Sequence, residues 1–326
     1  MKRKIYYLPP KSNSIFIMTN PFYNPDEQRL RSLFRVLLFI FLFSIAVSIP
    51  FLIPFEPVQF IGQSVMTLGL FYMMFRFVDQ RAWRDSGLIM TKTWIKECLM
   101  GVAIAGTAMG LIFLSLWLTE GLEVTGYGWD RNGQSFWMVP LFYFFIRMAS
   151  VGFYEEVMAR GYLIPNIIEG FTFGNITPQK AAVIAVIISS SIFGILHASN
   201  PNASVTAVIN IIFAGVMLAV PYLITGRLAL SIGLHFSWNF FQGGVFGFRV
   251  SGMEFRHSII QIQQGGPEWW TGGAFGPEAG LIGIFGMLFI LGLSILYLKR
   301  TGVKLGYAEN FRTAFQKEEI SEESTN

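Results

Sequence analysis

Long apolar segments recur along this chain, and they restrict it to one class of fold. Of its 326 residues, 53% are hydrophobic and only 13% are charged. A soluble domain averages about 25% charged residues, whereas a membrane-spanning helix needs about 20 consecutive, mostly apolar residues. Because apolar runs of this length recur from residue 33 onward, the sequence predicts an all-α, polytopic membrane protein.

The apolar runs predict about eight transmembrane helices. They cover residues 33–54, 57–78, 97–118, 136–164, 181–199, 203–224, 228–247 and 278–298. The fourth run is longer than a bilayer requires, so this helix is expected to tilt, break or project. No internal repeat divides the series. We therefore expect a cytoplasmic N-terminal segment over 1–32, a single transmembrane domain over 33–300, and a disordered cytoplasmic tail over 301–326.

Positive charge is distributed unevenly among the connections between these runs. Most Lys and Arg residues lie in the N-terminal segment, the 76–96 loop and the C-terminal tail, which fall on one side of an eight-helix bundle. The opposite connections carry only Arg131, Arg249 and Arg256. Cytoplasmic connections hold the excess of Lys and Arg in membrane proteins, so both termini are expected in the cytoplasm.

Ionisable side chains interrupt the apolar pattern of the fourth run, residues 136–164. Such residues are costly at bilayer depth and are functional candidates for that reason. Glu156 and Arg160 are four residues apart, so they share a helix face and can form an ion pair. Glu155 lies about 100° around the helix and points elsewhere, which leaves its carboxylate free for chemistry. The sequence assigns no role to Arg147 in the same run.

Two later runs carry further polar side chains. Phe193 and His197 end the fifth run, and His235 and Asn239 share a face of the seventh. At 1.5 Å per residue, Glu155, His235 and Asn239 lie about 10–16 Å from the cytoplasmic ends of their helices, and His197 about 20–25 Å. They can therefore converge in the cytoplasmic half. A carboxylate can take a proton from water, and imidazole and amide donors can stabilise an oxyanion.

Together these motifs resemble the CPBP family, which includes the type II CAAX prenyl endopeptidases and the bacterial Abi proteins. Glu-Glu-x-x-x-Arg begins at Glu155, Phe-x-x-x-His ends at His197, and His-x-x-x-Asn ends at Asn239. The resemblance covers residues 136–247, and the eight-span layout also fits it. It implies an intramembrane endopeptidase of the CAAX-protease type. A membrane-associated peptide or protein would be its substrate and a bacterial cell membrane its location.

The resemblance also implies roles for the individual side chains. Glu155 would be the general base, and His197 would help to position the attacking water. His235 and Asn239 would form the oxyanion site.

Three further residues of these motifs would support the catalytic set. The resemblance implies that Glu156 and Arg160 form an ion pair beside it. Phe193 is expected to pack under His197.

The metal requirement stays open at this point. Glu155, His197 and His235 could together ligate zinc, as a metalloprotease would require. The same residues also suffice for a metal-free, glutamate-type endopeptidase.

Two other classes of function could use the same polar residues. A non-proteolytic scaffold or bacteriocin-immunity-type protein of the same fold would keep the cluster for structure. A proton-coupled transporter could use carboxylates and histidines on facing helices as a proton relay, although no inverted repeat of the kind many transporters have is visible. In each case the lipid bilayer is a partner and nucleic acid is not.

Overall fold

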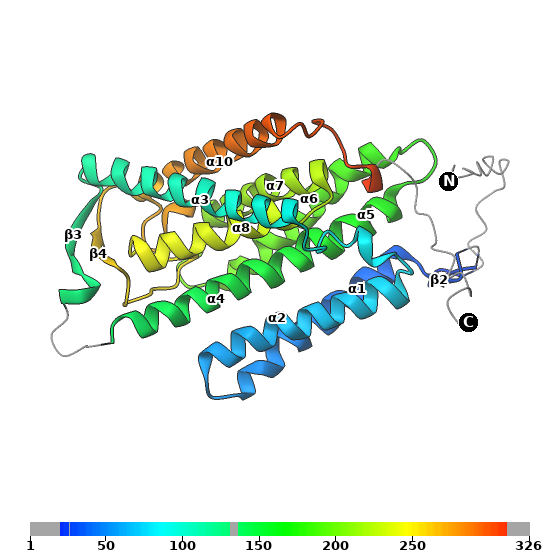
Figure 1. Cartoon of the computed structure of the whole chain (residues 1–326), viewed down its shortest axis with the longest axis horizontal. Helices are drawn as coiled ribbons and strands as arrows, with labels where there is room; N and C mark the ends of the chain where they lie inside the picture. Colours follow the sequence, from blue (N-terminus) through cyan, green and yellow to red (C-terminus); the bar gives the residue numbers. More distant parts are fainter. Residues whose placement is uncertain (1–19, 26, 131–135, 312–326) are drawn as a thin grey trace.

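The computed structural model describes residues 20–25, 27–130 and 136–311, which form a bundle of long helices (Figure 1). The α-helices are α1 (Ser32–Ser48), α2 (Glu56–Met73), α3 (Lys92–Leu118), α4 (Met138–Glu156), α5 (Ile164–Phe171), α6 (Pro178–Leu196), α7 (Val205–Thr225), α8 (Ala229–Asn239), α9 (Glu268–Thr271) and α10 (Leu281–Arg300). Two short antiparallel strand pairs join them, β1 (Tyr23–Asn24) with β2 (Arg29–Leu30), and β3 (Leu122–Tyr127) with β4 (Ile260–Gln264).

Short π-helical and 3₁₀ segments continue or connect these helices. The π-helical segments are η2 (Met74–Val78) after α2, η5 (Val157–Leu163) after α4 and η7 (Phe240–Val245) after α8. The 3₁₀ segments are η1 (Ile49–Leu52), η3 (Trp83–Asp85), η4 (Gly128–Asp130), η6 (His197–Ser199), η8 (Pro277–Ala279) and η9 (Glu309–Phe311). The fourth expected span therefore does not break, because η5 leads α4 directly into α5.

Six helices are long and apolar enough to cross a membrane within the part of the chain that the structure describes. They span Ser32–Leu52, Glu56–Val78, Lys92–Leu118, Pro178–Ser199, Val205–Thr225 and Leu281–Arg300. These helices confirm the prediction of an all-α, polytopic integral membrane protein. The other two expected spans, 136–164 and 228–247, are also helical. They hold Glu155 and His235, the polar residues that the sequence singled out.

Buried charged residues join the helices at the end of the bundle where most Lys and Arg residues lie. The Asp79 carboxylate accepts hydrogen bonds from Arg35 Nη1 at 2.9 Å, Tyr162 Oη at 3.2 Å and Asn166 Nδ2 at 3.2 Å. These partners come from α1, η5 and α5, so Asp79 connects the first two helices to the α4–α5 unit.

Glu169, on α5, extends the same cluster. Its carboxylate pairs with Arg29 and Arg81 at 2.8 Å each, and it also contacts Arg35. Burial by itself would raise the pKa of Glu169, but the positive charges of these arginines outweigh burial and lower the pKa below its ordinary value. Glu169 is therefore held as a carboxylate.

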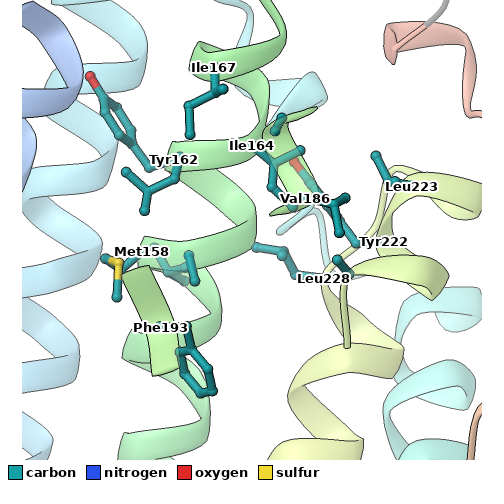
Figure 2. Close-up of a cluster of buried hydrophobic side chains, with 14 of the residues drawn as sticks. Met158, Tyr162, Ile164, Ile167, Val186, Phe193, Tyr222, Leu223 and Leu228 are labelled. Atoms are coloured by element: carbon teal, nitrogen blue, oxygen red, sulfur yellow. The ribbon is translucent and has the colours of Figure 1, made fainter. Parts of the chain in front are cut away.

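A buried apolar core fills the bundle next to this charged cluster. In Figure 2, which shows part of it, Ile164 of α5 lies toward Val186 of α6, whereas Tyr162 points the other way, toward α1, where its ring lies 3.7 Å from that of Phe39. Met158 lies nearer the middle of the bundle in the same cluster. Side chains thus fill the Lys/Arg-rich half of the bundle.

The end of the described chain packs against this half. After α10, residues 301–311 return to the bundle, where Ala308 donates its N–H to the Leu223 carbonyl at 2.7 Å. Phe311 is buried, and its ring lies 5.1 Å from that of Tyr222. The expectation of disorder from residue 301 onward is therefore wrong for 301–311, because this segment buries an aromatic side chain. Residues 312–326 of the expected tail and 1–19 of the expected N-terminal segment lie outside the described residues.

Glycine lets α4 approach α8 closely. A Cβ added at Gly152 would lie 2.9 Å from the Phe236 backbone nitrogen, closer than side chains normally pack. On α8, a Cβ at Gly233 would lie 2.1 Å from the Cys98 carbonyl oxygen of α3. The helix that carries His235 is therefore held between α3 and α4 by two glycine contacts.

We predict that Asp79→Ala lowers the free energy of unfolding by about 3–5 kcal/mol, because it leaves the buried charge of Arg35 with fewer partners. Thermal or denaturant unfolding of the protein in detergent would measure this loss. Glu254→Ala is the control, since Glu254 pairs with the exposed Arg256 and such a surface pair contributes about 0–1 kcal/mol. Equal losses in the two variants would contradict the structural role of Asp79.

The close contact at Gly152 predicts that Gly→Ala changes the free energy of unfolding in opposite directions at two positions. Gly→Ala inside a helix ordinarily stabilises by about 0.5–1 kcal/mol. We expect that gain, or no loss, for Gly292→Ala in α10, where an added Cβ meets nothing within 4 Å. Gly152→Ala should instead destabilise by about 1–3 kcal/mol, as overpacking does. The same unfolding measurement distinguishes them, and a stabilising Gly152→Ala would refute the close contact.

Candidate functional site

A cavity of about 630 Å³ lies within the bundle, and all four candidate catalytic side chains line it. Glu155 comes from α4, His197 from η6 at the end of α6, and His235 and Asn239 from α8. The structure thus brings together residues from three helices that are up to 84 positions apart in sequence (239 − 155). Much of the remaining wall is apolar and rich in Phe and Met.

One face of α4 and of the first turn of η5 forms a wall of this cavity. Its lining residues are Arg147, Met148, Val151, Tyr154, Glu155 and Met158. Their separations of one, three or four positions define a single stripe along a helix. Glu156 is not part of the stripe, because it lies about 100° around the helix from its neighbour. The two adjacent glutamates therefore have different surroundings, as the sequence predicted.

Glu156 is fully buried and joins three helices. Its Oε1 lies 2.9 Å from Arg160 Nη1, which is the ion pair expected from the sequence, and 2.8 Å from His235 Nδ1. Arg160 Nη2 donates to the Gly215 carbonyl of α7 at 3.0 Å. The contact between Glu156 and His235 was not foreseen, since sequence spacing gives no register between helices. Through it, Glu156 fixes the orientation of the His235 ring.

His235 also faces the second glutamate. Its Nε2 lies 3.7 Å from Glu155 Oε2, a separation longer than a hydrogen bond. That Glu155 oxygen has no hydrogen-bond partner among the described residues, and the side chain is 19% exposed. Glu155 is therefore a partly exposed carboxylate on the cavity wall, and its buried Oε2 has no hydrogen bond among the described residues.

His197 has a defined ring orientation. Its Nδ1 lies 2.8 Å from the Phe193 carbonyl oxygen, and a carbonyl oxygen can only accept a hydrogen bond. Nδ1 therefore carries the proton, and Nε2 of the neutral ring is an acceptor. The Phe193 ring packs 4.8 Å from the His197 ring and 5.9 Å from the His235 ring, with the Arg160 guanidinium 4.6 Å from it on another side. Phe193 thus packs against both histidines and the buried arginine.

The helices deviate from α-geometry beside these residues. The π-helical segment η5 begins directly after Glu156, and η7 begins directly after Asn239. π-helical turns occur frequently at functional sites. Asn239 is 9% exposed and lines the cavity.

The sequence missed a polar cluster on the opposite wall. Glu278 of η8 accepts hydrogen bonds from the Ser251 backbone N–H at 2.5 Å and from Ser251 Oγ at 3.0 Å, and it contacts Gln242. Asn200 donates to the Ser251 carbonyl at 3.1 Å. The only sequence signal was a glutamate at the first position of the last expected span, 278–298. Glu278 belongs to no motif, so spacing gave no reason to place it near Glu155.

The expected zinc ligands do not form a metal site. Among the residues that the structure describes, no group of three or more His, Cys, Asp and Glu side chains is arranged to hold a metal ion. Nδ1 of His235 is engaged by Glu156 and Nδ1 of His197 by a backbone carbonyl, which leaves Nε2 as the remaining ring nitrogen of each. Glu155, His197 and His235 share the cavity, but they do not form such a group.

The cavity extends toward the end of the bundle opposite the Lys/Arg-rich connections. Its exposed lining residues include Phe51 and Glu56 near the α1–α2 turn, Leu196 at the end of α6, and Met253 in the connection before β4. Toward the other end, the cavity borders the apolar core of Figure 2, in which Phe193 and Met158 line the cavity and Ile164 and Ile167 do not. The cavity thus reaches beyond the half in which the sequence expected the site residues to converge. Depth counted along single helices does not reveal where packing leaves space.

Comparison with known families agrees with the motif resemblance. Residues 136–241 match the family described as type II CAAX prenyl endopeptidase Rce1-like. This segment contains every motif residue from Glu155 to Asn239, whereas Glu56 and Glu278 lie outside it. No curated protein and no solved structure matches the chain.

Proposed function

Because residues 136–241 match the type II CAAX prenyl endopeptidase Rce1-like family, we propose that this integral membrane protein is an intramembrane endopeptidase. It hydrolyses a membrane-proximal peptide bond in a membrane-associated substrate, with water activated by Glu155. The observation that carries this proposal is the Glu155 carboxylate, which faces the cavity with one oxygen free of hydrogen bonds among the described residues.

In the first step, water attacks the carbonyl carbon of the scissile bond. Glu155 takes a proton from this water as general base. Nε2 of His197 accepts a hydrogen bond from the other O–H group of the water and so holds the water in position. The C–O bond forms as the carbonyl π bond opens, which leaves a tetrahedral intermediate with a negative oxygen. When the C–N bond breaks, Glu155 returns the proton to the leaving nitrogen.

His235 and Asn239 stabilise the negative oxygen in this proposal. The Asn239 amide donates directly, whereas His235 donates from Nε2 in its imidazolium form. Glu156 supports that form from Nδ1, at 2.8 Å, much as the buried aspartate of a serine-protease triad supports its histidine. Removing one oxyanion donor typically reduces kcat by about 100–1,000-fold.

The proposed chemistry is that of a glutamate-type endopeptidase and needs no metal ion for any step above. The described residues contain no group of three or more His, Cys, Asp and Glu side chains arranged to hold a metal ion, which supports this choice. A chelator should therefore leave activity unchanged.

Glu155→Gln should reduce peptide cleavage by about 100–10,000-fold, since that is the usual contribution of a positioned general base. The assay is cleavage of a fluorogenic peptide library by the detergent-purified protein, with and without chelator. Glu254→Gln is the matched control on an exposed glutamate. Full activity in Glu155→Gln would refute the mechanism. A wild-type protein that cleaves nothing, together with a cellular phenotype that survives Glu155→Gln, would favour the scaffold or immunity-type function.

We further propose that both termini lie in the cytoplasm. Most of the described Lys and Arg residues gather at one end of the bundle, and cytoplasmic connections hold the excess of these residues in membrane proteins. In this orientation the cavity opens to the non-cytoplasmic side. The substrate bond would then be cleaved near that membrane surface, in a bacterial cell at the outer face of the cell membrane.

Cysteine labelling in intact cells tests this orientation. Cys98, the single cysteine, is first replaced by Ser. A cysteine at Met253, which lines the cavity and is 38% exposed, should react with a membrane-impermeant maleimide added outside. A cysteine at Phe173, which is 56% exposed in the α5–α6 connection, should react only after permeabilisation. The reverse pattern would invert the orientation without affecting the proposed chemistry.

A further inference from the structure

Arg147 lies on the cavity wall and has no part in the mechanism above. We propose that Arg147 binds a carboxylate of the peptide substrate and so determines where the chain is cut. This inference rests on the proposed endopeptidase function and adds a specificity residue to it.

The position of Arg147 relative to Glu155 defines a distance along the substrate. Both residues belong to the α4 stripe that lines the cavity, eight positions apart. Eight residues of helix correspond to about 12 Å along the axis. An extended peptide rises about 3.3 Å per residue, so a bound carboxylate would lie about three to four residues from the scissile bond.

The contacts of Arg147 are weak enough that its guanidinium can donate hydrogen bonds to a stronger acceptor instead. Its nearest carboxylate is that of Glu56, at 3.6 Å from Nη1, whereas charge-assisted hydrogen bonds are about 2.7–2.9 Å long. Nη2 has only the weak acceptor Met253 Sδ, at 3.3 Å, and Nε has no hydrogen-bond partner among the described residues. The Phe60 ring supports the guanidinium at 5.2 Å.

The structural arginine of the same helix unit provides the contrast. Arg160 is 1% exposed and donates to Glu156 at 2.9 Å and to a backbone carbonyl at 3.0 Å. Arg147 is 29% exposed toward the cavity, and its partner Glu56 is 47% exposed at the cavity edge. A charge at this depth is costly unless paired, so a substrate carboxylate that replaces the long contact would be favoured. The planar guanidinium suits bidentate binding of that group.

The carboxylate can come from a substrate C-terminus or from an acidic side chain, and peptides distinguish the two. Starting from a peptide that the wild type cleaves, one derivative carries a C-terminal amide, and another has each Asp or Glu beyond the scissile bond replaced by Asn or Gln. We expect one derivative to raise KM about tenfold with little change in kcat. Unchanged KM for both derivatives would overturn the proposal.

Two variants identify Arg147 as the residue responsible. Arg147→Gln should raise KM for the carboxylate peptide by a similar factor and make the enzyme indifferent to the loss of that carboxylate. Glu56→Gln should lower KM for the same peptide, because it removes the competing carboxylate. A purely structural Arg147 would instead lower kcat for all peptides alike, or lower the unfolding temperature, and Glu56→Gln would not tighten binding.

Binding measurements keep this proposal separate from the proposed function. The Glu155→Gln protein should bind the labelled carboxylate peptide about tenfold more tightly than its neutral derivative, as measured by fluorescence polarisation in detergent. Adding Arg147→Gln should abolish that difference. If the wild type cleaves no peptide but this difference is found, the endopeptidase function fails and the carboxylate site stands. Equal binding of the two peptides overturns the carboxylate site whether or not cleavage occurs.

Discussion

The buried carboxylate of Glu156 is the interaction on which the site depends. It is fully buried, and an unpaired charge in such surroundings would cost several kcal/mol. It therefore needs both Arg160 and His235, at 2.9 and 2.8 Å. Because Arg160 also binds the Gly215 carbonyl of α7, one carboxylate fixes the relative positions of α4, α7 and α8. The ring of His235 is consequently held in one orientation toward the cavity.

Charged side chains of this bundle fall into two groups. At the Lys/Arg-rich end, Asp79 and Glu169 have several close partners each and join the first two helices to α5. On the cavity wall, Glu155 and Arg147 have no partner carboxylate or cation at hydrogen-bond distance within the described part of the chain. Side chains with several close partners hold helices in place. Side chains with only long contacts can exchange those contacts for a bound ligand. This difference separates residues that support the fold from those that we propose to act on a substrate.

The sequence was sufficient to predict a membrane protein and to predict that the two adjacent glutamates of α4 have different surroundings. Long apolar runs have no other stable environment, and helical spacing is a local property. Spacing therefore predicted that Glu156 would pair with Arg160 while Glu155 faced elsewhere. The same rule places Arg147 and Glu155 on one face, since eight residues are close to two turns. Three motifs in order also predicted the family. The π-helical segments after Glu156 and Asn239 had no sequence signature, because they depend on how neighbouring helices pack.

What the sequence by itself determined is thus the set of helices, their polar faces and the residues that those faces carry. Only the tertiary structure decided that His235 binds Glu156, that Glu278 lines the cavity opposite α4, and that the cavity extends away from the Lys/Arg-rich end. The reason is physical. Periodicity fixes the direction of a side chain around its own helix, but the distance between two helices depends on the small residues at their contact, such as Gly152 against Phe236. The space left between helices is a property of all their contacts together.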